Sequence, residues 1–357
     1  MGKIAKEGMG IDELVKIAVP ICQQAEQECP RTGPGRRPEI PDWVMTVLIL
    51  VVVAKRRKTK SAQYRFLKSH QAELSRWMGT SRFPSRSTYF SRYRRAYKLL
   101  QFALRIQSLL EAEAGHIQLR CVAVDKSLIP TCGAKWANAQ KVKGRLPAGA
   151  DIESAWTFSP YHGWVLGYGY EVVVTAQRQG IVWPILASVE PANVSERTTF
   201  PRKIEQLPPQ IRYVLADKGY DSQDLATAVE VTRSAGHACR QRRFVCPLQE
   251  RHNVGQAKQT WNQTHRRRQR WERRQKRRLY MQTKFAKRLF SRRSRTVEPF
   301  NEWFKSLFEL NEKAWHRGLG NNRTQILAAL LVYQFLLRYN QHHNRPNAQV
   351  RGILDAL

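Results

Sequence analysis

The sequence predicts an α/β protein in which a mixed sheet is flanked by helices and follows an all-helical N-terminal region. Residues 1–115 carry helical apolar spacing and helix-capping residues, whereas strand patterns begin only near residue 117. From there a meander of strands passes into alternating helices and strands, which favours a mixed sheet with helices on its faces. We therefore expect a helical region at 1–115, an α/β domain at 116–340 and a polar, peripheral tail at 341–357.

The charge of the chain predicts a polyanionic partner. Among 357 residues, 61 Lys and Arg face 28 Asp and Glu, which gives a formal net charge of +33. Such an excess favours nucleic acid first and an anionic membrane surface second. The longest apolar run, residues 44–54, is too short to span a membrane and too far from the N-terminus for a signal peptide, so we expect a buried helix. The six cysteines form no CxxC pair, which favours reduced thiols of a cytoplasmic protein over a zinc site.

The helical region contains a pattern that favours a helix-turn-helix. Asp42 is a candidate N-cap for the apolar helix, and another helix is expected over residues 61–80. Pro84 then breaks the chain, and Ser85 can cap a new helix. A short basic helix after a tight turn is typical of modules that enter the major groove of DNA, although a solvated helical surface has the same composition. The candidate DNA contacts here are four arginines: Arg82, Arg86, Arg92 and Arg95.

The later part of the chain alternates strand and helix patterns. Strands are expected over residues 119–125, 163–177, 181–189, 212–216 and 244–248. Helices are expected over residues 195–208 and 222–235. The first of these strands ends on Asp125, and the fourth is followed by Asp217 and a tight turn that contains Gly219.

A strongly basic stretch occupies the insertion expected at about residues 250–295. Between residues 265 and 295 there are 15 Lys or Arg and one acid, Glu272. Aromatic residues interrupt the charges at intervals, which argues against plain disorder, although a solvated basic helix or a loop remains an alternative. Such a stretch would follow a phosphate backbone, and its binding would depend strongly on salt. Two apolar helices are expected after it, over residues 296–339.

Carboxylates at strand ends predict a site for divalent cations. Asp125 and Asp217 would lie at the ends of adjacent strands, and Mg²⁺ prefers one or two carboxylates together with waters and substrate phosphates. Two such ions can activate an attacking oxygen and stabilise a leaving one. A third carboxylate is expected from a neighbouring helix, where we favour Glu298, and Glu302 competes one turn away. Lys305 follows Glu298 by seven positions on the same helical face, where it could hold a DNA phosphate.

Other acids have simpler explanations in the sequence. Asp221 fits a turn residue that hydrogen-bonds to its own backbone. Asp151 and Glu153 lie in a Gly/Pro-rich loop, and we expect them at the surface.

Four segments between residues 118 and 335 resemble the DDE transposases of bacterial insertion sequences, in the group that includes insertion sequence families four and five. The segment Val-Ala-Val-Asp at 122–125 is similar to the first-aspartate strand of that family. Residues 191–196 are similar to its Ala-Asn-x-x-Asp/Glu segment. Residues 216–222, Ala-Asp-Lys-Gly-Tyr-Asp-Ser, resemble its most specific motif, around the second aspartate. Residues 297–305 are similar to its element with Glu and Lys separated by six residues.

The resemblance implies a ribonuclease-H-like fold with Asp125, Asp217 and Glu298 as the metal-binding catalytic triad. It implies two Mg²⁺ (or Mn²⁺) ions per active site. It also implies binding to terminal inverted repeats, strand cleavage by water and joining of the freed 3′-hydroxyl to target DNA. In insertion sequence family four, Tyr and Arg stand at fixed distances before the glutamate. This chain has Ser291 and Ser294 at those positions.

Further candidate DNA contacts lie around the triad, and they are Lys218, Arg293, Arg295 and Lys305. Two alternatives remain open at this point. One is a ribonuclease-H-like nuclease that only hydrolyses DNA, and the other is a catalytically inactive DNA-binding relative. For an active transposase we expect a homodimer on DNA, no membrane association, and a cytoplasmic, nucleoid-associated location.

Overall fold

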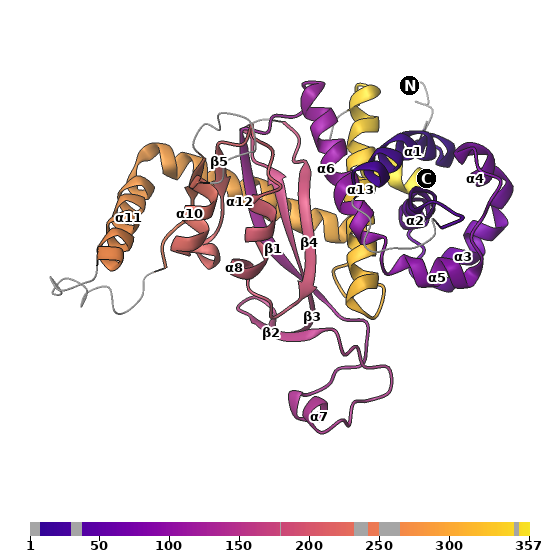
Figure 1. The fold of residues 1–357 in the computed structure, drawn as a ribbon, viewed down its shortest axis with the longest axis horizontal. Helices are drawn as coiled ribbons and strands as arrows, with labels where there is room; N and C mark the ends of the chain where they lie inside the picture. The colour runs from indigo at the N-terminus through magenta and orange to yellow at the C-terminus, as the bar shows by residue number, and fades with distance from the viewer. Residues whose placement is uncertain (1–7, 30–37, 179, 232–241, 250–264, 346–349) are drawn as a thin grey trace, which may run out of the picture.

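The computed structural model describes residues 8–29, 38–178, 180–231, 242–249, 265–345 and 350–357 (Figure 1). Three parts of the sequence-based expectations lie outside these residues: Cys239, the end of the helix expected up to residue 235, and residues 250–264 of the basic stretch. The five described cysteines are free thiols. None of the described helices is both long enough and apolar enough to cross a bilayer.

Six helices form the N-terminal region, on one side of the molecule (Figure 1). They are α1 (Ile11–Glu28), α2 (Asp42–Ala54), α3 (Lys60–Ser69), α4 (Gln71–Met78), α5 (Arg86–Tyr93) and α6 (Tyr97–Glu113). The apolar run is a buried helix, as expected: every residue of α2 from Val44 on is at most 1% exposed, because α1, α6 and α13 surround it. Ser85 caps α5 as predicted, since its hydroxyl accepts the amide of Thr88. The N-cap of α2 is Pro41 rather than Asp42, because Asp42 already belongs to the helix.

The second region contains a mixed six-stranded sheet with helices on its faces, which confirms the predicted class. The strands are β1 (Cys121–Pro130), β2 (Ala155–Ser159), β3 (Gly163–Thr175), β4 (Pro184–Pro191), β5 (Tyr213–Leu215) and β6 (Arg243–Val245). Their order is β2-β3-β1-β5-β6, and β4 also pairs with β3. The pairs β1–β5 and β5–β6 are parallel, while the remaining pairs are antiparallel.

The first strand does not end at Asp125 as expected. β1 continues to Pro130 because it pairs with β3 from Val122 to Pro130. Its parallel pairing with β5, however, ends at the rung formed by Ala123 and Leu215. Asp125 and Asp217 therefore both lie two residues beyond the same rung, and the sheet itself sets these two positions in register.

Other elements refine the predicted borders. The helix expected over 195–208 consists of two short helices, α8 (Glu196–Thr199) and α9 (Pro201–Ile204), with a proline at the start of the second. The short α7 (Asn138–Val142) and β2 were not expected. The helix expected over 222–235 is α10 (Gln223–Val231) in its described part, and a 3₁₀ turn, η1 (Lys218–Tyr220), follows β5.

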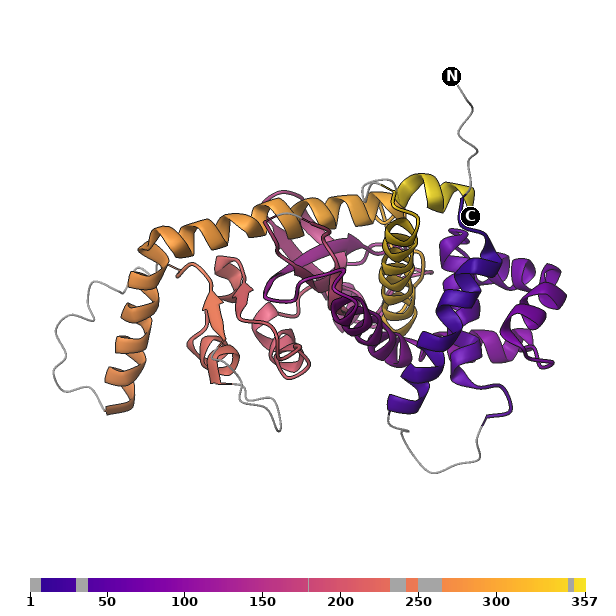
Figure 2. The ribbon, with the colours of Figure 1, turned by 90° about the horizontal axis from the view of Figure 1, so that it is seen from above.

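Long helices complete the fold after the sheet. They are α11 (His265–Gln282), α12 (Lys284–Leu307), α13 (Leu319–His342) and α14 (Val350–Ala356). The basic stretch passes directly into α12, so no new helix begins at residue 296. Seen from above, α12 runs along one face of the sheet, and α11 lies at an angle to α12 (Figure 2). Within α12, the face that packs on β1 carries Leu289, Arg293, Val297, Phe300 and Phe304.

Two expectations about the surface were wrong. The tail is not peripheral, because Val350, Ile353 and Leu354 of α14 are at most 4% exposed and α14 packs on α13. Asp151 is 2% exposed. Its carboxylate accepts hydrogen bonds from the hydroxyls of Tyr168 (2.5 Å) and Thr131 (3.1 Å) and from the amide of Gly318. Asp151 therefore joins the loop after β1 to the start of α13.

Candidate active site

The turn after β5 presents the Asp217 carboxylate at the edge of the sheet. Asp217 is the N-cap of η1, and its Oδ1 accepts the amide of Gly219 at 2.9 Å. A Cβ at position 219 would lie 2.9 Å from that same oxygen, so any larger residue here would push the Asp217 carboxylate out of its present position. Tyr220 points into the core and donates to Glu171 Oε1 at 2.9 Å. The turn is thus held from both ends, while the side chain of Asp217 stays 41% exposed.

Asp125 is more enclosed than Asp217. Its side chain is 18% exposed, and its Oδ2 accepts the Asn301 amide at 3.0 Å. Asn301 is held in turn by the hydroxyl of Tyr170, which donates to Asn301 Oδ1 at 2.7 Å. Burial raises the pKa of Asp125 to about 6, and the negative charges of Asp217 and Glu298 add to the rise, while Arg293 opposes it. Asp125 therefore sits among like charges in a fixed orientation.

Arg293 joins the three predicted carboxylates. Its Nη2 lies 2.8 Å from Asp125 Oδ1 and 3.9 Å from Asp217 Oδ2, and its Nη1 lies 2.5 Å from Glu298 Oε1. The Arg293 side chain is only 10% exposed. Acids from β1, the turn after β5 and α12 thus meet at one guanidinium, although 92 residues separate Asp125 from Asp217 and 81 separate Asp217 from Glu298.

The chemistry of these groups fits a divalent cation. Carboxylate oxygens are the preferred ligands of Mg²⁺, and three carboxylates around one guanidinium leave a formal surplus of two negative charges when all are ionised. In the part of the chain that the structure describes, no three Asp, Glu, His or Cys side chains are arranged around a common metal position. The cation among these three carboxylates is the guanidinium of Arg293.

Two predicted lysines lie near this cluster. Lys305 is on α12, two turns beyond Glu298, and is half-buried. Burial lowers the pKa of Lys305, while Glu302 and Asp125 raise it, which places its ammonium within electrostatic reach of the carboxylates. Lys218 follows Asp217 directly and is exposed. Both can offer a positive charge at the rim of the site.

The remaining predicted DNA contacts lie elsewhere. Arg295 is exposed on a different face of α12 from Arg293. In the N-terminal region, Arg82 pairs with Glu39 at 2.7 Å.

Around α5, Arg92 pairs with Asp42 and donates to the carbonyl of Ile40 at 2.7 Å. Arg92 is thus committed to holding α5 against α2. Arg86 lies over the ring of Phe90 and is exposed, as is Arg95. Arg86 on α5 and Arg95 just after it therefore remain the open candidates in this region.

Two functional positions were missed or misread in the sequence. Asn301 orients Asp125, and its spacing of three from Glu298 on one helix would have placed it on the same face. Asp221 is 1% exposed, and its carboxylate pairs with Arg274 (3.0 Å) and Arg277 (3.3 Å) of α11. It is therefore an anchor for the basic helix rather than only a turn residue, and no local pattern could reveal that, because the partners lie more than 50 residues away.

These features define a class of protein: a mixed sheet with flanking helices that carries an Asp-Asp-Glu cluster. A protein-family model described as the transposase DDE domain matches residues 117–335. This is more than half of the chain, and the chain belongs to that family, as the resemblance implied. Members of the family act on DNA in transposition, and their DDE domains generally use divalent metal ions. Searches of curated proteins and of solved structures found no match.

Proposed function

We propose that this protein is the transposase of an insertion sequence of the group that includes families four and five. It binds the terminal inverted repeats, cleaves DNA strands at the element's ends, and joins the freed 3′-hydroxyl to target DNA. The observation that carries the proposal is the meeting of Asp125, Asp217 and Glu298 at Arg293, within a chain of the DDE transposase family.

Asp125, Asp217 and Glu298 would hold the divalent ions, two per active site. Such ions activate the attacking oxygen and offset charge on the leaving one. Asn301 orients the Asp125 carboxylate through Oδ2, and a bound cation would take the place of Arg293 at Oδ1.

The cations of the chain position the DNA. Lys305 and Lys218 bind phosphates beside the scissile bond, and Arg293 neutralises charge on the phosphate once divalent ions replace it at the carboxylates. The short helix α5 recognises the repeat, with Arg86 exposed at its first position and Arg95 exposed just beyond its end. Two ends must be brought together for transposition, so we propose that the protein acts as a homodimer on DNA.

The decisive test compares Asp217→Asn with Asp224→Asn. Both changes remove one negative charge, but Asp224 is 86% exposed on α10 and pairs only with Arg270 among the interactions described. We expect Asp217→Asn to abolish Mg²⁺-dependent cleavage of inverted-repeat DNA with little loss of DNA binding, and Asp224→Asn to retain both. Undiminished cleavage by Asp217→Asn would remove the proposal.

Strand joining needs its own assay. When pre-cut ends with a free 3′-hydroxyl are supplied together with target DNA, the wild type should produce joined products. Cleavage without any joined product would reduce the protein to a hydrolytic nuclease on the same fold.

A further inference from the structure

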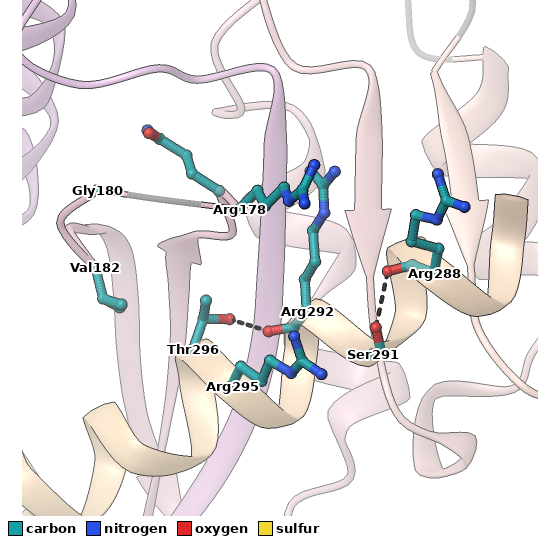
Figure 3. Close-up of a pocket in the computed structure, with 9 residues that line it drawn as sticks. Arg178, Gly180, Val182, Arg288, Ser291, Arg292, Arg295 and Thr296 are labelled. Carbon is teal, nitrogen blue, oxygen red and sulfur yellow. Dashed lines mark hydrogen bonds between the residues drawn. The ribbon is translucent and has the colours of Figure 1, made fainter.

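A groove lined by arginines lies between α12 and the turn that joins β3 to β4 (Figure 3). It has a volume of about 520 Å³. Among the described residues that line it there is no acid, and the charged side chains are Arg178, Arg288, Arg292 and Arg295. A neighbouring hollow of about 480 Å³ shares Gln177, Arg178 and Arg292 with it and adds Arg120. The two together form one continuous surface, which we name the arginine groove; its described lining residues include five arginines and no carboxylate.

The arginine groove is separate from the carboxylate cluster. Its wall includes Cys121 at the start of β1, four residues before Asp125, which corresponds to about 13 Å along a strand. On α12, Arg288, Arg292 and Arg295 follow the spacing i, i+4, i+7 and therefore share one stripe. Arg293 belongs to the other stripe, which faces the sheet. The groove thus does not contribute to holding the reacting phosphate.

The spacing of the three α12 arginines matches a phosphate backbone. Arg288 and Arg295 are seven residues apart on the helix, which is about 10 Å along its axis. One strand of B-DNA carries about three phosphates over that length. Guanidinium groups suit such a partner because they bind phosphate oxygens in a bidentate way.

We propose that the arginine groove binds the phosphodiester backbone of a DNA segment away from the scissile bond. The identity of the polyanion as DNA rests on the proposed transposase function, and the formal charge of +33 is consistent with it. DNA would then contact α12 at two places: at the active site on one face of the helix and at the arginine groove on another. An acidic protein segment is the competing occupant.

The test uses the full-length chain, a 30-base-pair duplex of arbitrary sequence and no divalent ion, so that the result does not depend on cleavage. The variant is Arg288→Ala/Arg295→Ala. Both side chains are exposed on α12, so the melting temperature should stay near that of the wild type. Arg292 is left unchanged because it lines the neighbouring hollow together with the buried Cys121.

Loss of two phosphate contacts should make the slope of log affinity against log salt shallower by about 1.8. Between 50 and 200 mM salt, the wild type should then lose about 12-fold more affinity than the variant.

Two controls separate position from total charge. Arg288→Lys/Arg295→Lys keeps both charges and should retain most of the wild-type slope. Lys16→Ala/Lys58→Ala removes two charges that already pair with Asp12 and Glu309, and it should leave the slope unchanged.

An equal slope for Arg288→Ala/Arg295→Ala and the wild type would overturn the proposal. Equal slopes on DNA together with weaker binding of poly-glutamate would also overturn it and assign the groove to an acidic protein. Failure of the proposed function is a different result: it would appear as absent cleavage by the wild type with Mg²⁺, whatever the salt slopes.

Discussion

The two faces of α12 place the same residue type in opposite surroundings. Arg293 meets carboxylates from β1, from the turn after β5 and from α12 itself, and it is 10% exposed. Arg288 and Arg295 of the same helix line a groove whose described lining contains no acid. The comparison teaches that the role of an arginine in a basic chain follows from what the fold brings opposite it. The face with Arg293 can bind cations at its carboxylates, and the face with Arg288 and Arg295 can bind an external polyanion.

The largest effect is expected where the carboxylate face is damaged. Glu298 and Glu302 are one turn apart on α12, but only Glu298 contacts Arg293 among the described interactions. Glu298→Gln should lower Mg²⁺-dependent cleavage by at least about a hundredfold, since a metal ligand supplies several kcal/mol. Glu302→Gln serves as the matched control and should stay within about threefold of the wild type. The reverse order in a cleavage assay would make Glu302 the third acid.

A second prediction contrasts the arginines themselves. Arg293→Ala leaves three partly buried carboxylates without their shared partner and should destabilise the metal-free protein by about 3 kcal/mol. Arg288→Ala, on the exposed face, should change stability by no more than about 0.5 kcal/mol. Both values can be read from denaturant unfolding.

Added Mg²⁺ sharpens this contrast. A cation that binds only the folded state raises its stability, so Mg²⁺ should raise the melting temperature of Arg293→Ala more than that of Arg288→Ala or the wild type. Arg293→Lys keeps the charge, so the rise in its melting temperature with Mg²⁺ should lie between those of Arg293→Ala and the wild type. If Arg293→Ala and Arg288→Ala lowered the free energy of unfolding equally, Arg293 would not be stabilising the three carboxylates.

A last prediction concerns the pH dependence of stability. The pKa of Asp125 is raised to about 6 in the folded chain, chiefly by burial, against about 3.9 in an unfolded one. Between these values the folded state holds a proton that the unfolded state has lost, so the contribution of Asp125 to stability falls as pH rises from about 4 to about 6.

Asp125→Asn should therefore remove this fall. The difference in melting temperature between variant and wild type should grow in favour of the variant from pH 4 to 6.5, without metal. A constant difference across that range would contradict the raised pKa. Taking the difference also cancels His316, whose pKa is lowered to about 3 by burial and whose effect on stability has the opposite sign.

Local patterns predicted much of the architecture. Strand β3 begins at the expected residue, Ser85 caps α5, and the run at 44–54 is a buried helix, because apolar periodicity, caps and prolines act over a few neighbouring residues. The predictions that were wrong concern features that depend on residues far away in the sequence. β1 continues beyond Asp125 because β3 pairs with it, and Asp151 is buried because Tyr168 and Gly318 reach it.

By itself, the sequence determined the class of fold, the basic character of the chain and which three acids are candidates for one site, since motif spacing and net charge are properties of the chain. Only the tertiary structure decided that Asp125 and Asp217 both lie two residues beyond the last rung between β1 and β5, and that Arg293 faces the acids while Arg295 faces the arginine groove. The reason is geometric: strand register and helix rotation set side-chain direction, and both are settled by packing between segments more than 80 residues apart.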